Sequence, residues 1–267
     1  MTILTKKKII IANWKLNGNL ILIKNLLEKI SLIPGYILKS IDLILLPPHV
    51  YLLEVKRNLF KKDEIYIGAQ NIDKHFFGAY TGETSVLMLQ DIGVKYVLIG
   101  HSERKKYHLE SEKSISEKFK IVKSCNLIPI LCIGETKKEK QLGQTEIICK
   151  KQIDEIFNLL EHKDETFNNS IIAYEPIWSI GTGQIPELKE INEIISFIKN
   201  YIKKKIFPKK VKNFFVIYGG SVNSNNVQRI FKKGGSDGLL VGAASLSHKD
   251  FSKIIYNSYY TNKKENI

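Results

Sequence analysis

One carboxylate stands where a general base could act, at the end of an apolar segment. Glu175 follows the run 171–174 and precedes Pro176, Trp178 and a glycine-containing segment, 181–183. A base at a strand end, beneath a hinged loop, suits the removal of a proton in a site that excludes water. A surface glutamate before a turn is the alternative, because proline and glycine punctuate many loops.

Two other side chains offer the charge stabilisation that proton abstraction requires. His101 lies in the segment 99–104, Ile-Gly-His-Ser-Glu-Arg, and Lys15 follows the apolar run 9–12. The positive end of a helix dipole favours a neutral imidazole, and a neutral ring can donate a hydrogen bond to a developing oxyanion. An ordinary N-cap histidine and a solvated lysine are the alternatives. Glu135 is expected to be structural rather than catalytic.

Glycines after two later apolar runs offer backbone N–H groups with little steric cover. Gly219, Gly220 and Ser221 follow one run, and Gly242 follows the next. Such groups suit a phosphate, and tight packing is the alternative. Other phosphate motifs fail, since no G-x-x-x-x-G-K-[ST] occurs and Pro186 replaces the third glycine of a dinucleotide fingerprint. No His, Cys or acidic residues cluster at metal spacing, so we expect no metal and no cofactor.

Short apolar runs that must position these groups alternate with amphipathic runs along the chain. The runs are apolar throughout, which is typical of parallel strands buried on both faces. We predict an α/β fold, a (β/α)₈ TIM barrel of eight parallel strands in a single domain, residues 1–267, with a doubly wound open sheet as the alternative. The expected strands are 9–12, 43–46, 65–68, 96–99, 128–132, 171–174, 214–218 and 238–241.

The amphipathic runs predict the helices of this barrel. In a parallel barrel all strand ends open on one face, where such enzymes build their sites. Lys15, His101 and Glu175 are therefore expected to converge. The expected helices are 20–33, 51–59, 85–92, 111–124, 144–161, 188–204, 224–232 and 249–258.

The formal net charge of the 267-residue chain is +14. Such a charge raises the possibility of a nucleic-acid or membrane partner. Lysines are nevertheless scattered along helix faces, and the cluster 203–205 lies near a predicted helix end, where cations are favourable. We therefore favour a general compositional bias and expect neither nucleic acid nor membrane as a partner.

The cysteines, Cys125, Cys132 and Cys149, form no C-x-x-C pair. This pattern predicts neither a disulfide framework nor a zinc site and favours a reducing cytoplasm. The first apolar run is too short for a signal peptide, and no segment approaches the length of a transmembrane helix.

Eight segments, taken in chain order, resemble the triosephosphate isomerase family over nearly the whole chain. They are 12–15, 68–71, 78–83, 99–104, 132–135, 173–178, 218–222 and 240–246. The resemblance implies a cofactor-free enzyme that interconverts dihydroxyacetone phosphate and glyceraldehyde 3-phosphate through an enediolate.

The resemblance also implies a role for each polar residue of the site. Glu175 corresponds to the base and His101 to the neutral electrophile, which is how the reaction of this family is generally described. Lys15 corresponds to the cation that binds the substrate and offsets the enediolate charge. Asn13 corresponds to a companion polar contact, and Glu103 to a group that orients the catalytic side chains.

The phosphate grip and the lid are implied in the same way. Gly181, Ser221, Gly242 and Ala243 correspond to phosphate-binding positions, and residues 176–186 to the closing lid. Two of the departures from the family pattern fall in these parts. The far hinge of the lid reads Gln-Ile-Pro at 184–186, where proline predicts altered lid kinetics, and the side chain of Ala243 disfavours a positive φ.

Segment 78–83 resembles the family loop that inserts into a neighbouring subunit. We therefore expect a homodimer, with Thr81 near the partner's site and with Glu83 and Arg104 as interface charges. Three alternative functions remain open: a barrel isomerase for another sugar phosphate, a nucleic-acid-binding module, and an inactive scaffold. The presence of Lys15, His101 and Glu175 argues against the scaffold.

Overall fold

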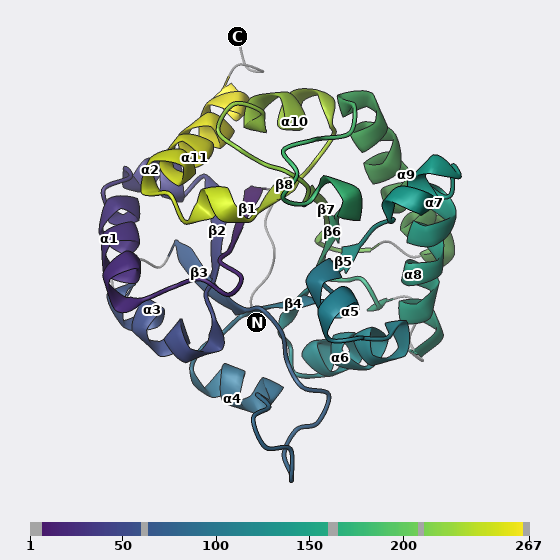
Figure 1. Cartoon of the computed structure of the whole chain (residues 1–267), viewed down its shortest axis with the longest axis horizontal. Helices are drawn as coiled ribbons and strands as arrows, with labels where there is room; N and C mark the ends of the chain where they lie inside the picture. The colour runs from purple at the N-terminus through teal and green to yellow at the C-terminus, as the bar shows by residue number, and fades with distance from the viewer. Residues whose placement is uncertain (1–6, 60–63, 160–164, 208–210, 264–267) are drawn as a thin grey trace.

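A closed ring of parallel strands forms the centre of the molecule (Figure 1). The computed structural model describes residues 7–59, 64–159, 165–207 and 211–263. Each strand pairs with the next in sequence, and β8 pairs with β1. This confirms the predicted (β/α)₈ barrel and excludes the open sheet. The strands are β1 Lys8–Asn13, β2 Ile41–Leu46, β3 Ile65–Ala69, β4 Tyr96–Ile99, β5 Ile128–Ile133, β6 Ser170–Tyr174, β7 Phe214–Tyr218 and β8 Gly238–Val241.

The strands are buried on both faces, as their continuous apolar sequences predict. Every residue of β2 and β5 is buried, because one face points into the barrel and the other packs against helices. The ring is thus a packed core, and its strand ends are fixed supports for side chains. The barrel interior is filled by Ile9, Ile11, Ile44, Leu46, Tyr96, Leu98, Ile128, Ile130, Cys132, Ile171, Ala173, Ile217 and Leu240.

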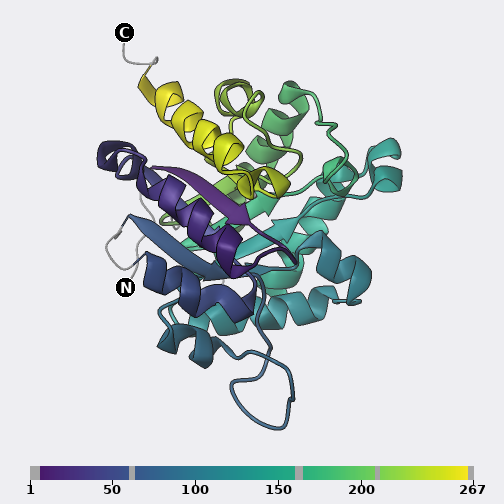
Figure 2. The same ribbon diagram turned by 60° about the vertical axis from the view of Figure 1, so that its left-hand side comes forward.

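Helices surround the ring (Figures 1 and 2). Those predicted from apolar periodicity are confirmed in position, although the last residues predicted for α8, 160 and 161, lie outside the described residues. They are α1 Leu20–Ser31, α3 Leu52–Asn58, α4 Val86–Asp91, α6 Glu112–Ser124, α8 Thr145–Leu159, α9 Leu188–Ile206, α10 Val227–Lys233 and α11 His248–Lys263.

Helix α10 begins later than predicted, at Val227 instead of residue 224. The side chain of Asn223 accepts hydrogen bonds from the backbone N–H groups of Asn225 and Asn226, at 2.9 and 3.2 Å. This turn competes with helix formation and delays the first helical residue. Short helices that the sequence did not predict are α2 Gly35–Leu38, α5 Ser102–Tyr107 and α7 Lys137–Gln141.

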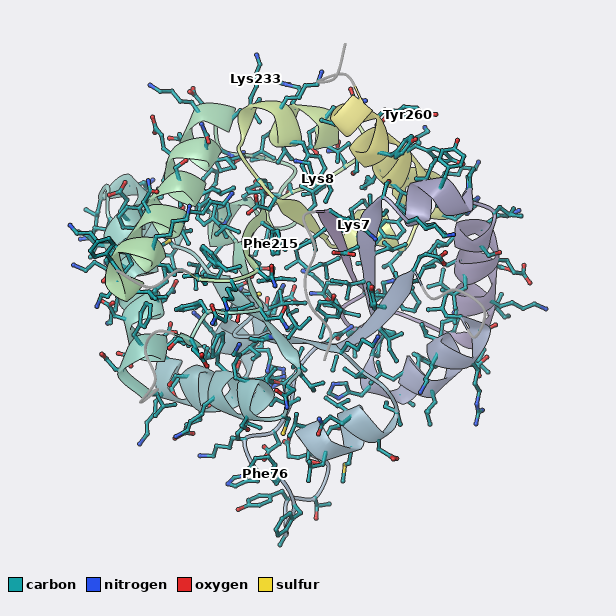
Figure 3. The ribbon with its side chains drawn as sticks, turned by 180° about the vertical axis from the view of Figure 1, so that it is seen from behind. Lys7, Lys8, Phe76, Phe215, Lys233 and Tyr260 are labelled. Carbon is teal, nitrogen blue, oxygen red and sulfur yellow. The ribbon has the colours of Figure 1, made fainter. Side chains whose placement is uncertain are left out.

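The segment between β3 and α4 projects beyond the ring of helices (Figures 1 and 2). Phe76 marks this projecting loop, residues 70–85, in the view from behind (Figure 3). Its base is closed by a hydrogen bond of 2.9 Å from the N–H of Asp73 to the carbonyl of Thr84. Among the described helices, none combines the length and the apolar character needed to cross a membrane.

Candidate active site

Glu175 lies directly after β6, and only 2% of its surface is exposed. Its backbone N–H donates to the carbonyl of Ile133 at 2.8 Å, which fixes it against β5. Carboxylate Oε1 lies 3.5 Å from Nε2 of His101. Oε2 is buried without a hydrogen-bond partner among the described residues. A carboxylate held at one oxygen, with the other unpaired, is suited to receive a proton from a bound molecule.

Two glycines make room for this carboxylate. A Cβ added to Gly134 would lie 2.0 Å from the carbonyl oxygen of Glu175, and one added to Gly219 would lie 2.8 Å from its Cγ. Both contacts are shorter than atoms tolerate, so neither position accepts a side chain without a shift of the base. The base is therefore positioned by close backbone approach from β5 and β7.

His101 forms the N-cap of α5, as the alternative interpretation of this histidine predicted. Its Nδ1 accepts a hydrogen bond from the N–H of Glu103 at 3.2 Å. Because Nδ1 is the acceptor, the proton of a neutral ring resides on Nε2, the nitrogen nearer Glu175. The capping role thus prepares the ring to donate from Nε2, and the structural and chemical interpretations describe the same arrangement.

Lys15 has a left-handed backbone, with a φ of 52°. Such a conformation is costly for a residue with a side chain and persists only where neighbours enforce it. The N–H of Lys15 donates to Oδ1 of Asn13 at 3.0 Å. The side-chain amide of Gln70 donates to the carbonyls of Lys15 and Leu46, at 3.0 and 2.8 Å. These contacts turn the chain as it leaves β1.

Glu103 connects the lysine to the histidine. Nζ of Lys15 donates to Oε1 of Glu103 at 2.5 Å, while Oε2 of Glu103 lies 3.7 Å from Nδ1 of His101. The ion pair is partly exposed, with 27% of the Lys15 side chain accessible. Glu103 therefore orients the ammonium group without removing it from the solvent-accessible side of the site.

A cavity of about 280 Å³ lies at the ends of the strands. This volume is at the small end of the range for ligand pockets. All of the residues predicted for catalysis or substrate binding line this cavity except Glu103. Those that line it are Asn13, Lys15, His101, Glu175, Gly181, Ser221, Gly242 and Ala243. The structure thus gathers groups from β1, β4, β6, β7 and β8 around one small volume.

The segment 176–186 lies along this cavity. The N–H of Gly183 donates to Oγ of Ser221 at 3.2 Å, which ties the tip of the segment to the residues after β7. Indole Nε1 of Trp178 donates to Oε1 of Glu135 at 2.7 Å. Glu135 is fully buried, and burial raises its pKa, although hydrogen bonds from Trp178 and Tyr174 partly offset the effect. As predicted, Glu135 serves the structure, here by anchoring the near hinge of this segment.

Comparison with known proteins identifies the family. The model of the family described as triosephosphate isomerase matches residues 8–258. The chain belongs to the triosephosphate isomerase family. The triosephosphate isomerase of Buchnera aphidicola subsp. Baizongia pistaciae (strain Bp) is 50% identical over 256 residues, covering 94% of this chain and 99% of that protein.

Two other relatives carry the same name. The triosephosphate isomerase of Buchnera aphidicola subsp. Cinara cedri (strain Cc) is 50% identical over 253 residues, covering 93% of this chain and 97% of that protein. The triosephosphate isomerase of Blochmanniella floridana is 45% identical over 249 residues, covering 92% of this chain and 94% of that protein. The likeness extends over the whole barrel and over every segment that contributes to the cavity.

The departure at Ala243 from the usual pattern of triosephosphate isomerases is accommodated without strain. Ala243 begins a short 3₁₀ helix, Ala243–Ser245, and is absent from the described residues that have a positive φ. The side chain of Ala243 therefore meets no left-handed backbone at this position. The first backbone hydrogen bond within this turn runs from the N–H of Ser245 to the carbonyl of Gly242, at 2.8 Å. The N–H groups of Ala243 and Ala244 come before it in the chain, and both residues line the cavity.

The residues predicted to meet a second subunit lie apart from the small cavity. Thr81 is exposed on the projecting loop. Glu83 and Arg104 line a second cavity of about 510 Å³, which shares Lys15 and His101 with the first. Nε of Arg104 lies 3.3 Å from Oε1 of Glu110. The second cavity is thus open to this loop and joined to the small cavity through the catalytic candidates.

The structure also places, beside the site, residues to which the sequence assigned no role. The clamp of Gln70 on the backbone of Lys15 depends on the meeting of β1, β2 and β3 in three dimensions. The hydroxyls of Ser179, within the segment 176–186, and of Tyr218, the last residue of β7, lie 3.3 Å apart. No group of three or more potential metal ligands occurs within the described part of the chain.

Proposed function

We propose that this enzyme interconverts dihydroxyacetone phosphate and D-glyceraldehyde 3-phosphate. Its membership of the triosephosphate isomerase family gives the substrate class. The observation that carries the proposal for the site is the convergence of Glu175, His101 and Lys15 on one cavity of about 280 Å³. A cavity of this size suits a three-carbon phosphate better than a larger sugar phosphate.

The reaction is a proton transfer between adjacent carbons. Glu175 removes a proton from the carbon beside the carbonyl, and the electron pair of that C–H bond forms the double bond of an enediolate. The Nε2–H of His101 gives its proton to the carbonyl oxygen, and the ring then takes back the hydroxyl proton from the neighbouring oxygen, while the ammonium of Lys15 offsets the negative charge. Glu175 then returns the proton to the neighbouring carbon, so that no atom is gained or lost.

Backbone groups hold the phosphate during this transfer. We assign the grip to the N–H groups of Gly181, Ser221, Gly242 and Ala243, which line one side of the cavity. Asn13 supplies a further polar contact, and Glu103 orients Lys15. The lid excludes water, which protects an enediol phosphate from losing its phosphate group.

A coupled assay of the wild-type enzyme and Glu175→Gln tests this assignment. Removal of the base is expected to lower kcat by ~10³-fold or more, since positioned acid–base groups supply ~10²–10⁴-fold. Glu193→Gln, an exposed carboxylate on α9, is the matched control and should retain full activity. An inactive wild-type enzyme, or an active Glu175→Gln variant, would contradict the proposal. A panel of larger sugar phosphates tests the rival isomerase activity.

We further propose that the enzyme is a homodimer joined through the projecting loop. Apolar side chains gather beside the second cavity and on the loop, and 97% of Leu16 and 85% of Phe77 are exposed. Patches of this kind commonly mark protein interfaces. In the dimer Thr81 approaches the partner's site, while Glu83 and Arg104 take part in contacts across the interface. A monomeric mass from light scattering at micromolar concentration would overturn this proposal.

The remaining proposals concern domain organisation and location. We infer that residues 1–267 form one domain, supported by the single closed barrel whose strands extend from Lys8 to Val241. A single cooperative thermal transition is the expected result. We also infer a cytoplasmic location, supported by the free thiols of Cys125, Cys132 and Cys149. Cell fractionation tests it.

A further inference from the structure

Ser179 is a fully buried serine at the near end of the lid, in the short 3₁₀ helix Ile177–Ser179. Residues 181–184, which follow it, are exposed. Burial of a hydroxyl is unfavourable unless its hydrogen bonds are satisfied. The partners of Ser179 therefore indicate what its hydroxyl does.

The hydroxyl joins the two hinges of the lid to the end of β7. Its Oγ donates to the carbonyl of Gln184, at the far hinge, at 2.6 Å. With its one proton used there, Oγ accepts from the N–H of Ser221 at 3.3 Å. The hydroxyl of Tyr218 lies 3.3 Å away. Burial raises the pKa of Tyr218 to about 12, so Tyr218 keeps its proton at neutral pH and donates to Oγ.

The backbone of Ser179 repeats this connection. Its carbonyl accepts a hydrogen bond from Oγ of Ser221 at 2.6 Å, so that both the N–H and the hydroxyl of Ser221 are bonded to Ser179. Between them, the backbone of Gly220 approaches closely. A Cβ at Gly220 would lie 2.1 Å from the hydroxyl of Tyr218 and 2.8 Å from Oγ of Ser179. The packing leaves space for the hydroxyl groups only because residue 220 has no side chain.

We propose that the Ser179 hydroxyl is a positioning group that joins closure of the lid to the shape of the phosphate site. The inference rests on the proposed function, in which Ser221 belongs to the phosphate grip and its N–H is shared between Oγ of Ser179 and the bound anion as a three-centre hydrogen bond. A lid that is closed holds Ser221 in place through Ser179, and an anion that fixes Ser221 holds the lid closed by the same bonds. The coupling is reciprocal, as linkage requires.

Without this hydroxyl, the carbonyl of Gln184 and the N–H of Ser221 each lose one hydrogen-bond partner. The closed lid is then less favourable, and part of the binding energy of the phosphate must be used to close it. Affinity for phosphate ligands should therefore fall, while the proton transfer itself, performed by Glu175 and His101, should change little.

The test compares Ser179→Ala with Tyr218→Phe and with Ser258→Ala. Ser258 is an equally buried serine on α11, remote from the site, whose hydroxyl donates to the carbonyl of Ile254 at 2.7 Å. Kinetics give KM and kcat, and inhibition by inorganic phosphate gives Ki. Quenching of Trp178, which anchors the near hinge, follows phosphate binding without relying on catalysis.

Ser179→Ala should raise KM and the Ki of inorganic phosphate roughly tenfold, since the three hydrogen bonds of the hydroxyl are lost, with kcat within about twofold of the wild type. Tyr218→Phe should raise both constants by about two- to threefold, because one hydrogen bond is lost. Ser258→Ala should alter neither. If Ser179→Ala fails to fold, Tyr218→Phe decides the question by its Ki.

Two results separate this inference from the proposed function. Wild-type enzyme that isomerises its substrate, with Ser179→Ala indistinguishable from Ser258→Ala in Ki, overturns the inference alone. Wild-type enzyme without isomerase activity overturns the proposed function, while the fluorescence titration with phosphate still decides whether Ser179 couples the lid to anion binding.

Discussion

The two sides of the active site are built from different kinds of group. On the reaction side, defined by Lys15, His101 and Glu175, charged and aromatic side chains are held by contacts from rigid strand ends. On the grip side, defined by residues 181–183, 219–221 and 242–243, backbone groups and hydroxyls contact one another. The first side depends on charge, and the second depends on the absence of side chains.

This difference separates the expected effects of substitutions on kcat and KM. Groups of the reaction side interact most strongly with the charge that develops in the transition state, so their loss lowers kcat. Groups of the grip side interact with a phosphate that carries the same charge throughout, so their loss raises KM. Substitutions on each side show whether the two sides are separable in this way.

After the loss of the base itself, the largest effect is expected for Lys15→Met. The substitution removes the ammonium group of the reaction side and leaves the carboxylate of Glu103 unpaired. The value of kcat/KM should fall by about 10²–10³-fold, the cost of removing one preorganised charge-stabilising group. Steady-state kinetics measure it.

Lys189→Met is the matched control for this variant. Lys189 lies on α9, with 83% of its side chain exposed and a weak contact to Glu193 at 3.7 Å. Its loss lowers the net charge equally and should leave kcat/KM unchanged. If both variants lose activity in parallel at low salt, the general positive field of the protein, and not Lys15 itself, serves the substrate.

Adjacent glycines allow the sharpest comparison of the two sides. In Gly219→Ala the new Cβ displaces Cγ of Glu175, and kcat should fall by about 10- to 100-fold, since a misplaced catalytic group is costly. In Gly220→Ala the new Cβ displaces the hydroxyl of Tyr218, and KM should rise about tenfold through weakened contacts to Ser179. Equal effects of both variants on kcat would mean that the two sides are not separable.

A smaller effect is expected at the far hinge of the lid. Pro186 is buried and restricts φ where the lid rejoins the barrel. Pro186→Ala should change kcat or KM by about two- to fivefold, the range expected when a proline restriction is removed. Turnover and substrate affinity are both measured, and if neither changes, the proline has no influence on lid motion.

The smallest effect is one of pH on stability, at Glu135. Burial raises the pKa of Glu135 in the folded state above the ordinary value of 4.5. The folded state then binds more protons than the unfolded state just above that pH, so the free energy of unfolding falls as pH rises through this window. Glu135→Gln lacks this dependence. Its melting temperature should gain a few degrees relative to wild type between pH 4.5 and pH 7.

Asp154 supplies a control of opposite sign. Burial alone would raise the pKa of Asp154. Hydrogen bonds from Lys205 and Tyr201 nevertheless hold this pKa below its ordinary value. Its contribution to stability is therefore lost as pH falls. Asp154→Asn should lose melting temperature relative to wild type at neutral pH and approach it in acid. If the melting temperatures of both variants changed with pH in the same direction relative to wild type, the assigned directions of the two pKa shifts would be contradicted.

The strands could be predicted almost residue by residue, because each is an apolar run between polar or glycine residues. β4, β7 and β8 have the predicted bounds, and the others extend by one or two residues. The short helices escaped prediction for identifiable reasons. α2 has too few residues for a helical period, and α5 and α7 carry charges on all sides. The capping box of Thr136 and Glu139 was a usable signal for α7.

The residues of the small cavity could be anticipated from their positions after strands together with the family resemblance. What the sequence could not provide was the set of contacts that orient them. The clamp of Gln70 on Lys15 joins residues that are 55 positions apart, and the bonds of Ser179 reach 42 positions along the chain to Ser221. Such contacts depend on the register of neighbouring strands, which no local pattern of residues specifies.

The placement of Gln70 has a consequence for communication within an assembly. Gln70 is the first residue after β3 and thus the start of the projecting loop, while its amide fixes the unusual backbone of Lys15. A displacement of Gln70 would therefore act on the backbone of Lys15, whose side chain lines the small cavity. If the enzyme is the dimer proposed above, dilution should therefore lower its turnover before the chain unfolds.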